Sequence, residues 1–250
     1  MSYEAVATQK TPALIIYLLD CSASMSSDLD GTPRIDHVNR AIEKILVRMV
    51  QRSTKGEVIS PRYRLAMIAY SSTPQDILNG VQTIDKVVDK GKPVLRHQNS
   101  TDTAAAFAAA RDILNRELPL LGDGYPAPHV CHLTDGEFNG ADPEPIAREI
   151  MQMANADGNV LVSNIFVSTN LTGRPITDID NWPGITSESE LSNQYARKLF
   201  NMSSVLPQSY SQVIAEFGYQ LQPGCRMIIP AQSQGLIELA FAMSGATPTR

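Results

Sequence analysis

A continuous apolar run over residues 14–19, LIIYLL, ends at Asp20 and is followed at alternate positions by Ser22 and Ser24. Six apolar or aromatic residues in a row are typical of a strand buried on both faces, as in a parallel sheet covered by helices on each side. Ligands of open α/β sheets bind beyond the carboxyl ends of such strands. The segment therefore predicts a fold class and, at Asp20, the place of a site.

The rest of the chain continues with alternating helix and strand patterns. Residues 35–52 carry apolar side chains at three- and four-residue spacing, which predicts an amphipathic helix. Strands are predicted at 63–72, 129–135 and 159–168, helices at 103–118, 143–156, 188–202 and 210–219, a short edge strand or extended segment at 226–230, and a last short helix at 234–245. This order predicts an α/β fold with a doubly wound, mostly parallel central sheet flanked by helices.

The composition limits the classes of partner. The chain of 250 residues has a formal net charge of -5, and its 21 Lys and Arg residues are scattered along the sequence. Because nucleic-acid-binding proteins gather basic residues into a patch, no nucleic-acid partner is expected. The first residues have no apolar signal core, and no segment reaches the roughly 20 apolar residues of a membrane helix. We therefore expect a cytoplasmic protein with no membrane contact.

The cysteines and the single tryptophan each leave two interpretations. Cys21, Cys131 and Cys225 lie far apart with no CxxC spacing. They are predicted to be buried free thiols in a reducing compartment, with a disulfide between two of them as the alternative. Trp182 lies in a loop at 169–188 that is rich in Thr, Asp, Gly and Pro. Its ring either forms an exposed recognition patch or tucks this loop onto the core.

Two further stretches bring oxygen-bearing side chains to positions comparable with that of Asp20. Thr101 and Thr103 in NSTDTAAA stand at the start of the predicted alanine-rich helix, and Asp135 in HLTDGE ends the strand predicted at 129–135. Hydroxyls and carboxylates without His or Cys form a set of hard oxygen ligands, suited to Mg²⁺, Mn²⁺ or Ca²⁺ and poorly suited to zinc. The sequence therefore predicts a metal site made by five residues: Asp20, Ser22, Ser24, Thr101 and Asp135.

These motifs together resemble the von Willebrand factor A (vWA) domain and its metal-ion-dependent adhesion site (MIDAS). The resemblance is carried by DxSxS at 20–24, the TxT pair at 101–103 and TDGE at 134–137, in this order. It implies a Rossmann-like vWA domain over residues 11–220, preceded by a flexible N-terminus at 1–10. Residues 221–250 are then expected to form a C-terminal extension that packs on the domain and ends in a frayed tail.

The resemblance also implies a role for each site residue. Ser22, Ser24 and Thr101 would bind the cation, Mg²⁺ first and Mn²⁺ or Ca²⁺ as alternatives, through their hydroxyl oxygens. Asp20 and Asp135 would act largely through bound water. Because the three inner ligands are neutral, the bound cation can attract a carboxylate from another protein. The resemblance thus implies a metal-dependent module that binds an Asp or Glu of a partner protein and catalyses no reaction.

Residues around this site are predicted to form a rim that contacts the partner. Glu137, Phe138, Asn139 and Asp142 follow the metal aspartate, and Thr103 is left a helix-capping role or a place behind the ligands. Stretches such as DGTPRIDHVNRAI resemble small bacterial cytosolic vWA proteins of tellurite-resistance and stress operons. There the A domain is encoded with a protein kinase and a PP2C-type phosphatase, which the resemblance implies as candidate partners.

The enzymatic alternative is a Mg²⁺-dependent phosphohydrolase of haloacid-dehalogenase-like type, with Asp20 as the nucleophile. That chemistry needs a second acidic residue two positions after the nucleophile, where this chain has Ser22. A nucleotide-binding fold has less support still, because neither GxGxxG nor a P-loop motif is present. A binding module is therefore the first hypothesis and a phosphohydrolase the second.

Overall fold

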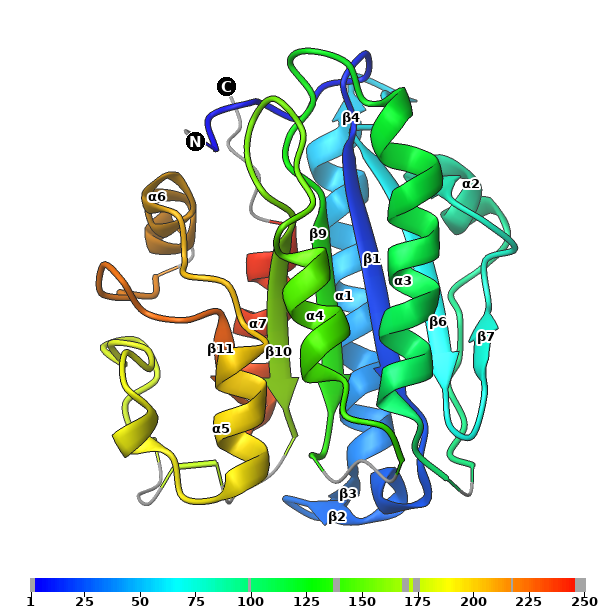
Figure 1. The fold of residues 1–250 in the computed structure, drawn as a ribbon. Coiled ribbons are helices and arrows are strands. Elements are labelled where there is room, and N and C mark those ends of the chain that lie inside the picture. Colours follow the sequence, from blue (N-terminus) through cyan, green and yellow to red (C-terminus); the bar gives the residue numbers. More distant parts are fainter. Residues whose placement is uncertain are drawn as a thin grey trace.

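The computed structural model describes residues 3–98, 100–136, 140–167, 171–172, 176–216 and 218–245 and, for Lys55, Gln212 and Glu216, only the backbone. These residues form three layers, in which a central sheet lies between two layers of helices (Figure 1). The layered arrangement is the α/β fold that the sequence predicts.

The sheet is built from seven strands, which span Ala13–Asp20 (β1), Tyr63–Tyr70 (β6), Pro74–Asp76 (β7), Gln82–Thr83 (β8), His129–Thr134 (β9), Leu161–Phe166 (β10) and Ile228–Pro230 (β11). Their order is β11-β10-β9-β1-β6-β7, and β8 also pairs with β6. Five strands run parallel, while β7 and β8 are antiparallel to β6. Every residue of β1, at the centre of the sheet, is buried. The directions and order of the strands confirm the predictions of a mostly parallel sheet and of an edge strand near 226–230.

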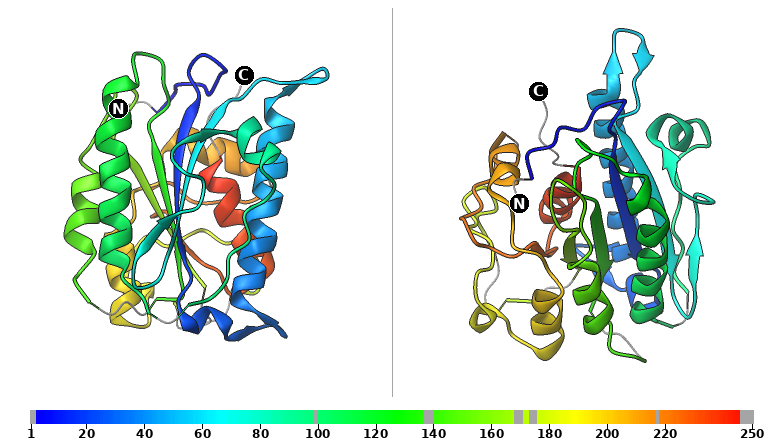
Figure 2. Two further views of the ribbon diagram at one scale, coloured as in Figure 1. Left: turned by 90° about the vertical axis from the view of Figure 1, so that its right-hand side faces the viewer. Right: turned by 45° about the horizontal axis from the view of Figure 1, so that its top comes forward.

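Helices cover both faces of the sheet; they span Arg34–Ser53 (α1), Ile84–Asp89 (α2), Thr103–Glu117 (α3), Glu144–Ile150 (α4), Gln194–Asn201 (α5), Gln208–Glu216 (α6) and Gln234–Ser244 (α7). α1 and α7 pack together on one face, and α3 and α4 pack on the other (Figure 2, left). α3 lies against β1 and β6, and its buried side carries the small side chains of Ala106 and Ala110. Small residues let a helix approach the sheet closely.

Two predicted helices differ from the structure. α4 ends at Ile150 instead of continuing to 156; the chain then turns at Asn155, whose Oδ1 accepts hydrogen bonds from the amides of Asp157 and Gly158. The helix predicted at 188–202 divides into a 3-10 turn at Glu188–Glu190 and α5, whose start is capped by Asn193. Asn193 satisfies a backbone amide at the start of α5 and so sets that helix boundary.

Several short elements lie outside the prediction. They are the hairpins of β2 (Asp28–Leu29) with β3 (Thr32–Pro33) and of β4 (Thr54–Lys55) with β5 (Val58–Ile59), together with β7, β8 and α2. All but α2 are two or three residues long, which is too short for a hydrophobic period to appear in the sequence.

The cysteines and the tryptophan follow one of the two interpretations in each case. Cys21, Cys131 and Cys225 are free and buried, as predicted. Trp182 is 8% exposed, so its ring tucks the loop onto the core and does not form a surface patch. Among the helices that the structure describes, none is long and apolar enough to cross a membrane.

The C-terminal part of the chain joins the central core. β11 pairs with β10, and Tyr17 of β1 contacts α7 through a 2.7 Å hydrogen bond to Ser244 Oγ and a stacked ring contact with Phe241. At the other end of the chain, the backbone amides of Glu4 and Ala5 donate to Asp157 Oδ1. The domain boundaries at residues 11 and 220, and the flexibility of residues 1–10, stay predictions.

Candidate functional site

The predicted site residues lie where β1, β6 and β9 end, at the edge of the sheet that holds the β2–β3 hairpin (Figure 1, bottom). Asp20 is the last residue of β1, and Asp135 follows directly after Thr134, the last residue of β9. Because β1 is hydrogen-bonded to both β6 and β9, the three strand ends are neighbours. The carboxyl edge of a parallel sheet is where α/β proteins place their ligands.

Asp20 is fully buried and held by two donors. Its Oδ1 accepts a 2.8 Å hydrogen bond from the Ser22 amide, and its Oδ2 accepts a 2.7 Å bond from Thr134 Oγ1. Burial raises the pKa of Asp20 from 3.8 to about 6; the bonds from Ser22 and Thr134 oppose this rise, and the charge of Asp135 adds to it. The carboxylate is thus fixed in direction, yet its charge is poorly compensated, which favours a bound cation.

The two serines of the DxSxS motif come together in the loop after β1. Ser22 Oγ and Ser24 Oγ are 3.0 Å apart, with Ser22 buried and Ser24 exposed. A 3-10 turn at Ala23–Ser26 brings them into this arrangement, and the fully buried Met25 anchors the turn in the core. One hydroxyl therefore lies at the floor of the site and the other at its opening.

Thr101 is placed by the segment that enters α3. The Gln98 amide donates to the Cys21 carbonyl, and the Asp102 amide donates over 2.7 Å to the Ser71 carbonyl. These bonds tie the segment to the exits of β1 and β6 on either side of Thr101, which is 4% exposed. The structure thus brings the threonine motif to the same edge of the sheet as Asp20.

The structure corrects the expectation for Thr103. Asp102 caps α3 by accepting a 2.9 Å bond from the Ala105 amide, so the helix cap is the residue before Thr103. Thr103 is 1% exposed, which leaves its hydroxyl no surface for direct contact with a partner. A place behind the ligands is the part of the prediction that agrees with this burial.

Asp135 forms an ion pair that the sequence did not reveal. Its Oδ2 accepts a 2.9 Å hydrogen bond from Nη1 of Arg34, the first residue of α1, and its side chain is 2% exposed. Its Oδ1 is buried and has no hydrogen-bond partner among the described residues. The one signal in the sequence was a lone arginine in the loop that leads from Ser24 into the helix.

The donor set fits a hard divalent cation. It combines three hydroxyls with two carboxylates, one of which has a buried oxygen with no partner in the described part of the chain. Oxygen donors of this kind suit Mg²⁺, Mn²⁺ and Ca²⁺. Among the residues that the structure describes, no three His, Cys, Asp or Glu side chains gather into a metal-binding group. Any site here therefore depends on the hydroxyls.

The predicted rim is described only in part. Glu137, Phe138 and Asn139 lie outside the described residues. Asp142 is exposed, pairs with Lys198 of α5 and accepts a bond from the Glu144 amide; these contacts lower its pKa, the bond from Lys198 most strongly. Asp142 thus links the loop after β9 to α4 and α5.

A buried polar chain supports the site from behind. Tyr70 at the end of β6 contacts His132 Nε2 over 2.7 Å, and His132 Nδ1 lies 2.7 Å from Asn164 Oδ1. Because the Asn164 amide nitrogen donates to Leu199 O, Met202 O and Ser203 Oγ, its oxygen must accept from His132 Nδ1. Neutral His132 then accepts from Tyr70. His132 is thus a fully buried, hydrogen-bonded residue of the core.

The geometry of Asp20 does not suit a nucleophile. Its side chain is completely buried, and each carboxylate oxygen already accepts a hydrogen bond from Ser22 or Thr134. A nucleophilic carboxylate must face its substrate. The phosphohydrolase alternative has no support.

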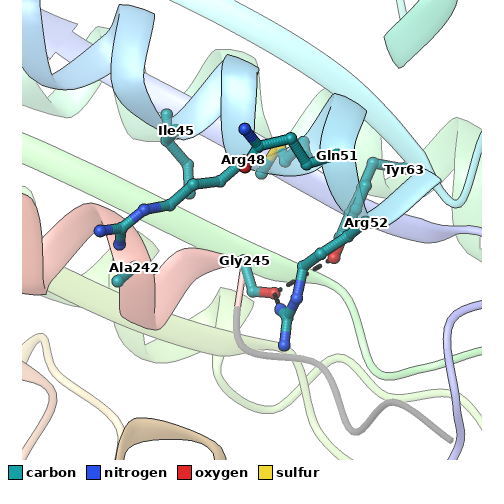
Figure 3. Close-up of a pocket in the computed structure, with 8 residues that line it drawn as sticks. Ile45, Arg48, Gln51, Arg52, Tyr63, Ala242 and Gly245 are labelled. Carbon is teal, nitrogen blue, oxygen red and sulfur yellow. Dashed lines mark hydrogen bonds between the residues drawn. The ribbon is translucent and has the colours of Figure 1, made fainter. Parts of the chain in front are cut away.

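A hollow of about 230 Å³ lies away from the predicted site, among α1, the start of β6 and the end of α7. Arg52 Nη1 donates over 2.8 Å to the carbonyl of Gly245, and Tyr63 Oη donates to the same carbonyl over 3.4 Å (Figure 3). These bonds fasten the end of α7 to the rest of the core. The hollow is therefore a structural junction.

The comparisons with known proteins agree with this fold. Residues 15–137 match the profile of the family described as the von Willebrand factor type A domain. This segment runs from β1 through the loop after β9, and so includes all five predicted metal ligands. No curated protein sequence matches the chain.

Among solved structures, the fold is similar to proximal thread matrix protein 1 from the mussel byssus, with a TM-score of 0.54, 15% identity, and coverage of 93% of this chain and 48% of that one. The pilus adhesin SpaC from Lactobacillus rhamnosus GG has a TM-score of 0.54 and 13% identity, with coverage of 94% of this chain and 30% of that one. An aerotolerance-related membrane protein from Bacteroides fragilis has a TM-score of 0.51 and 12% identity, with coverage of 93% of this chain and 99% of that one.

The chain therefore spans about half of the mussel protein and nearly all of the Bacteroides protein. At these identities the likeness concerns the fold alone. The sequence match adds the family over 15–137, where the site motifs lie. The family that the sequence match shows, over residues 15–137, is the von Willebrand factor type A domain.

Proposed function

We propose that this chain is a metal-dependent protein-binding module that uses a MIDAS-type site to hold an acidic residue of a partner protein. Ser22, Ser24 and Thr101 would hold a divalent cation through their hydroxyls, and Asp20 and Asp135 would orient its bound water. Mg²⁺ is the first choice and Mn²⁺ or Ca²⁺ the alternatives. The bound cation would supply an open coordination position for the carboxylate of an Asp or Glu.

The observation that carries the proposal is the buried Oδ1 of Asp135, which has no hydrogen-bond partner among the described residues. A buried carboxylate oxygen without a partner is costly, and a cation or its bound water would satisfy it. The raised pKa of Asp20, caused mainly by burial, supports the same conclusion. The carboxylates of Asp20 and Asp135 both lie at the carboxyl ends of the parallel strands, where the serine and threonine hydroxyls also lie.

Binding is favoured over catalysis because, among the described residues of the site, neither carboxylate is open to a substrate. Asp20 is held by two donors and is closed to solvent, while Ser24 stands at the opening. The exposed end of such a site can accept one carboxylate from a partner, and the surrounding loops would then supply specificity. We propose a cytoplasmic scaffold or regulator, in which the kinase and the PP2C-type phosphatase suggested by the sequence resemblance are the first partners to test.

The test compares two exposed serines of the same loop. Ser24→Ala removes a proposed ligand, whereas Ser27→Ala removes a serine just outside the 3-10 turn and serves as the matched control. Titration with Mg²⁺ and Mn²⁺ in a calorimeter is expected to give binding to the wild type and to Ser27→Ala, and strongly weakened binding to Ser24→Ala. Equal affinities for all three proteins would exclude Ser24 as a ligand.

The second half of the test concerns the partner. The full chain is used to capture proteins from the host lysate with Mg²⁺ or with EDTA, alongside Ser24→Ala and Ser27→Ala. Retention that needs both the metal and Ser24 supports the proposed anchor. The captured protein is then scanned by Asp→Asn and Glu→Gln substitutions for the anchoring acid. Retention that is indifferent to EDTA and to Ser24 would place the binding surface elsewhere.

A further inference from the structure

Arg34 connects two parts of the site that are distant in sequence. It is the first residue of α1, and its backbone amide donates over 2.9 Å to the Ser27 carbonyl in the loop that follows the site serines. Its guanidinium reaches the end of β9, where Nη1 lies 2.9 Å from Asp135 Oδ2. A permanent positive charge therefore contacts one of the two proposed metal-site carboxylates.

The ion pair between Arg34 and Asp135 is incomplete on both sides. Arg34 Nε and Asp135 Oδ1 are each buried without a hydrogen-bond partner in the described part of the chain. An arginine can pair with a carboxylate through two parallel bonds, and that arrangement would satisfy both atoms. The single bond leaves half of the carboxylate for another cation.

The charges explain what each cation contributes. Asp20 and Asp135 together carry two negative charges, and Ser22, Ser24 and Thr101 are neutral. Arg34 alone cancels one of these charges, whereas a divalent cation would cancel both. With both cations close to Asp135, the positive charges would repel each other. Arg34 and a metal ion therefore compete for the same carboxylate.

We propose that Arg34 is an internal competitor of the metal ion, an inference that rests on the proposed function. In the absence of metal, Arg34 neutralises the buried charge of Asp135 and keeps the strand end in place. When a divalent cation binds, the guanidinium gives up its contact with Asp135 and turns toward solvent. The affinity of the site for metal is then lower than the ligand set alone would give.

The position of Arg34 allows this exchange. Its side chain is 20% exposed, against 2% for Asp135, so the guanidinium already lies near the surface. It stands in the first turn of α1 between the exposed residues Pro33 and Asp36. A long arginine side chain can swing into water from such a position with little disturbance of the helix, while Asp135 cannot move without the strand end.

The experiment measures metal affinity and metal-free stability in the full chain. Arg34→Gln removes the charge and keeps much of the length, Arg34→Lys keeps the charge, and Arg40→Gln removes an exposed arginine further along α1 as the control. Mn²⁺ and Mg²⁺ are titrated into each protein by calorimetry. Arg34→Gln is expected to lower the Kd roughly tenfold, because the metal ion no longer has to break the attraction between the Arg34 guanidinium and the Asp135 carboxylate. Arg34→Lys and Arg40→Gln are expected to stay close to the wild type.

Thermal unfolding in EDTA gives an independent readout. Because Arg34→Gln leaves Asp135 without a counter-charge, its Tm in EDTA is expected to fall below that of the wild type. Added Mn²⁺ should raise the Tm of Arg34→Gln by more than it raises the Tm of the wild type. If Arg34→Gln does not stay folded in EDTA, removing Mn²⁺ from the loaded Arg34→Gln and from the loaded wild type with increasing chelator still gives the comparison of affinities.

The outcomes separate this inference from the proposed function. Metal binding of equal or lower affinity in Arg34→Gln overturns the competition while leaving the metal site in place, and so does an unchanged Tm in EDTA. The absence of metal binding in the wild type overturns the proposed site and the competition together. Tighter metal binding by Arg34→Gln, but not by Arg34→Lys or Arg40→Gln, supports both the metal site and the competition.

Discussion

Thr134 Oγ1 donates a 2.7 Å hydrogen bond to Asp20 Oδ2 and so joins the last residues of the adjacent strands β9 and β1. The two residues are 114 positions apart in sequence, and both are buried. The same hydroxyl accepts a 3.0 Å bond from the Gly136 amide, which leads the chain past Asp135. One threonine side chain therefore orients one proposed metal-site carboxylate and the backbone that carries the other.

Replacing Thr134 by Val keeps the shape of the side chain and removes both hydrogen bonds. A buried acceptor that loses its donor costs about 1–3 kcal/mol. The free energy of unfolding, measured by urea denaturation in EDTA, is expected to fall by this amount, and Mn²⁺ affinity should fall as well. Thr134→Ser retains the hydroxyl and is the control. Equal metal affinities in the valine and serine variants would show that the bond does not orient Asp20.

The raised pKa of Asp20 predicts opposite pH responses with and without metal. Its pKa of about 6 lies above the ordinary 3.8, so the folded metal-free protein binds this proton more tightly than the unfolded chain does. The stabilisation is full below about pH 4 and is lost as the pH rises through 6, by up to about 3 kcal/mol. Asp20→Asn removes this term, so the stability difference between the two proteins in EDTA should change over this range.

With Mg²⁺ present, the same group predicts the reverse trend. Metal binding requires the ionised carboxylate, so protons compete with the cation below about pH 6. Calorimetric titrations at pH 5, 6 and 7 are expected to show affinity rising with pH. An affinity that is flat over this interval would mean that Asp20 carries no proton for the metal to displace.

His132 predicts an acid-labile core. Burial lowers its pKa from 6.5 to about 4, and the bond to Asn164 only partly offsets this. The unfolded chain therefore binds the proton more tightly, and stability present above about pH 6.5 is lost as the pH falls toward 4, by up to about 3 kcal/mol. The difference in unfolding free energy between the wild type and His132→Gln should shrink over this range, because the variant lacks the titrating ring. A constant difference would contradict the prediction.

Gly136 is expected to tolerate no side chain. It has a φ of +107°, and a Cβ there would lie 1.8 Å from Cε2 of Phe166. Gly136→Ala should therefore shift the backbone beside Asp135, lower the Tm and weaken metal binding. Gly140→Ala is the matched control, since Gly140 has a φ of +122° but nothing within 4 Å of the added Cβ. If Gly136→Ala loses more Tm and more metal affinity than Gly140→Ala, the excess measures the clash with Phe166. Equal losses in the two variants would mean that backbone strain alone causes the effect.

The strand ends were predictable because they depend on local order in the sequence. An apolar run must be buried, so the residue that ends it, Asp20, stands at the edge of the sheet, and Ser22 and Ser24 follow within four residues. The helix beginning near Thr103 was predictable from its many alanines, and the strand ending near Asp135 from its short apolar segment. The shared oxygen donors of these separate segments predict one metal site, and the resemblance to the vWA family, which the family match over 15–137 supports, implies the role of each residue in it.

The contacts that tune the site were decided by the tertiary structure alone. The ion pair of Arg34 with Asp135 joins residues 101 positions apart, and the bond of Tyr70 with His132 joins residues 62 apart. Hydrophobic periodicity records which residues are buried and cannot record which of them meet, because that depends on the strand order β9-β1-β6 and on the angle at which α1 enters. The sequence by itself therefore determined which side chains are proposed as metal ligands and that they lie at the carboxyl ends of the parallel strands. Only the packing of strands and helices decided which charges face them.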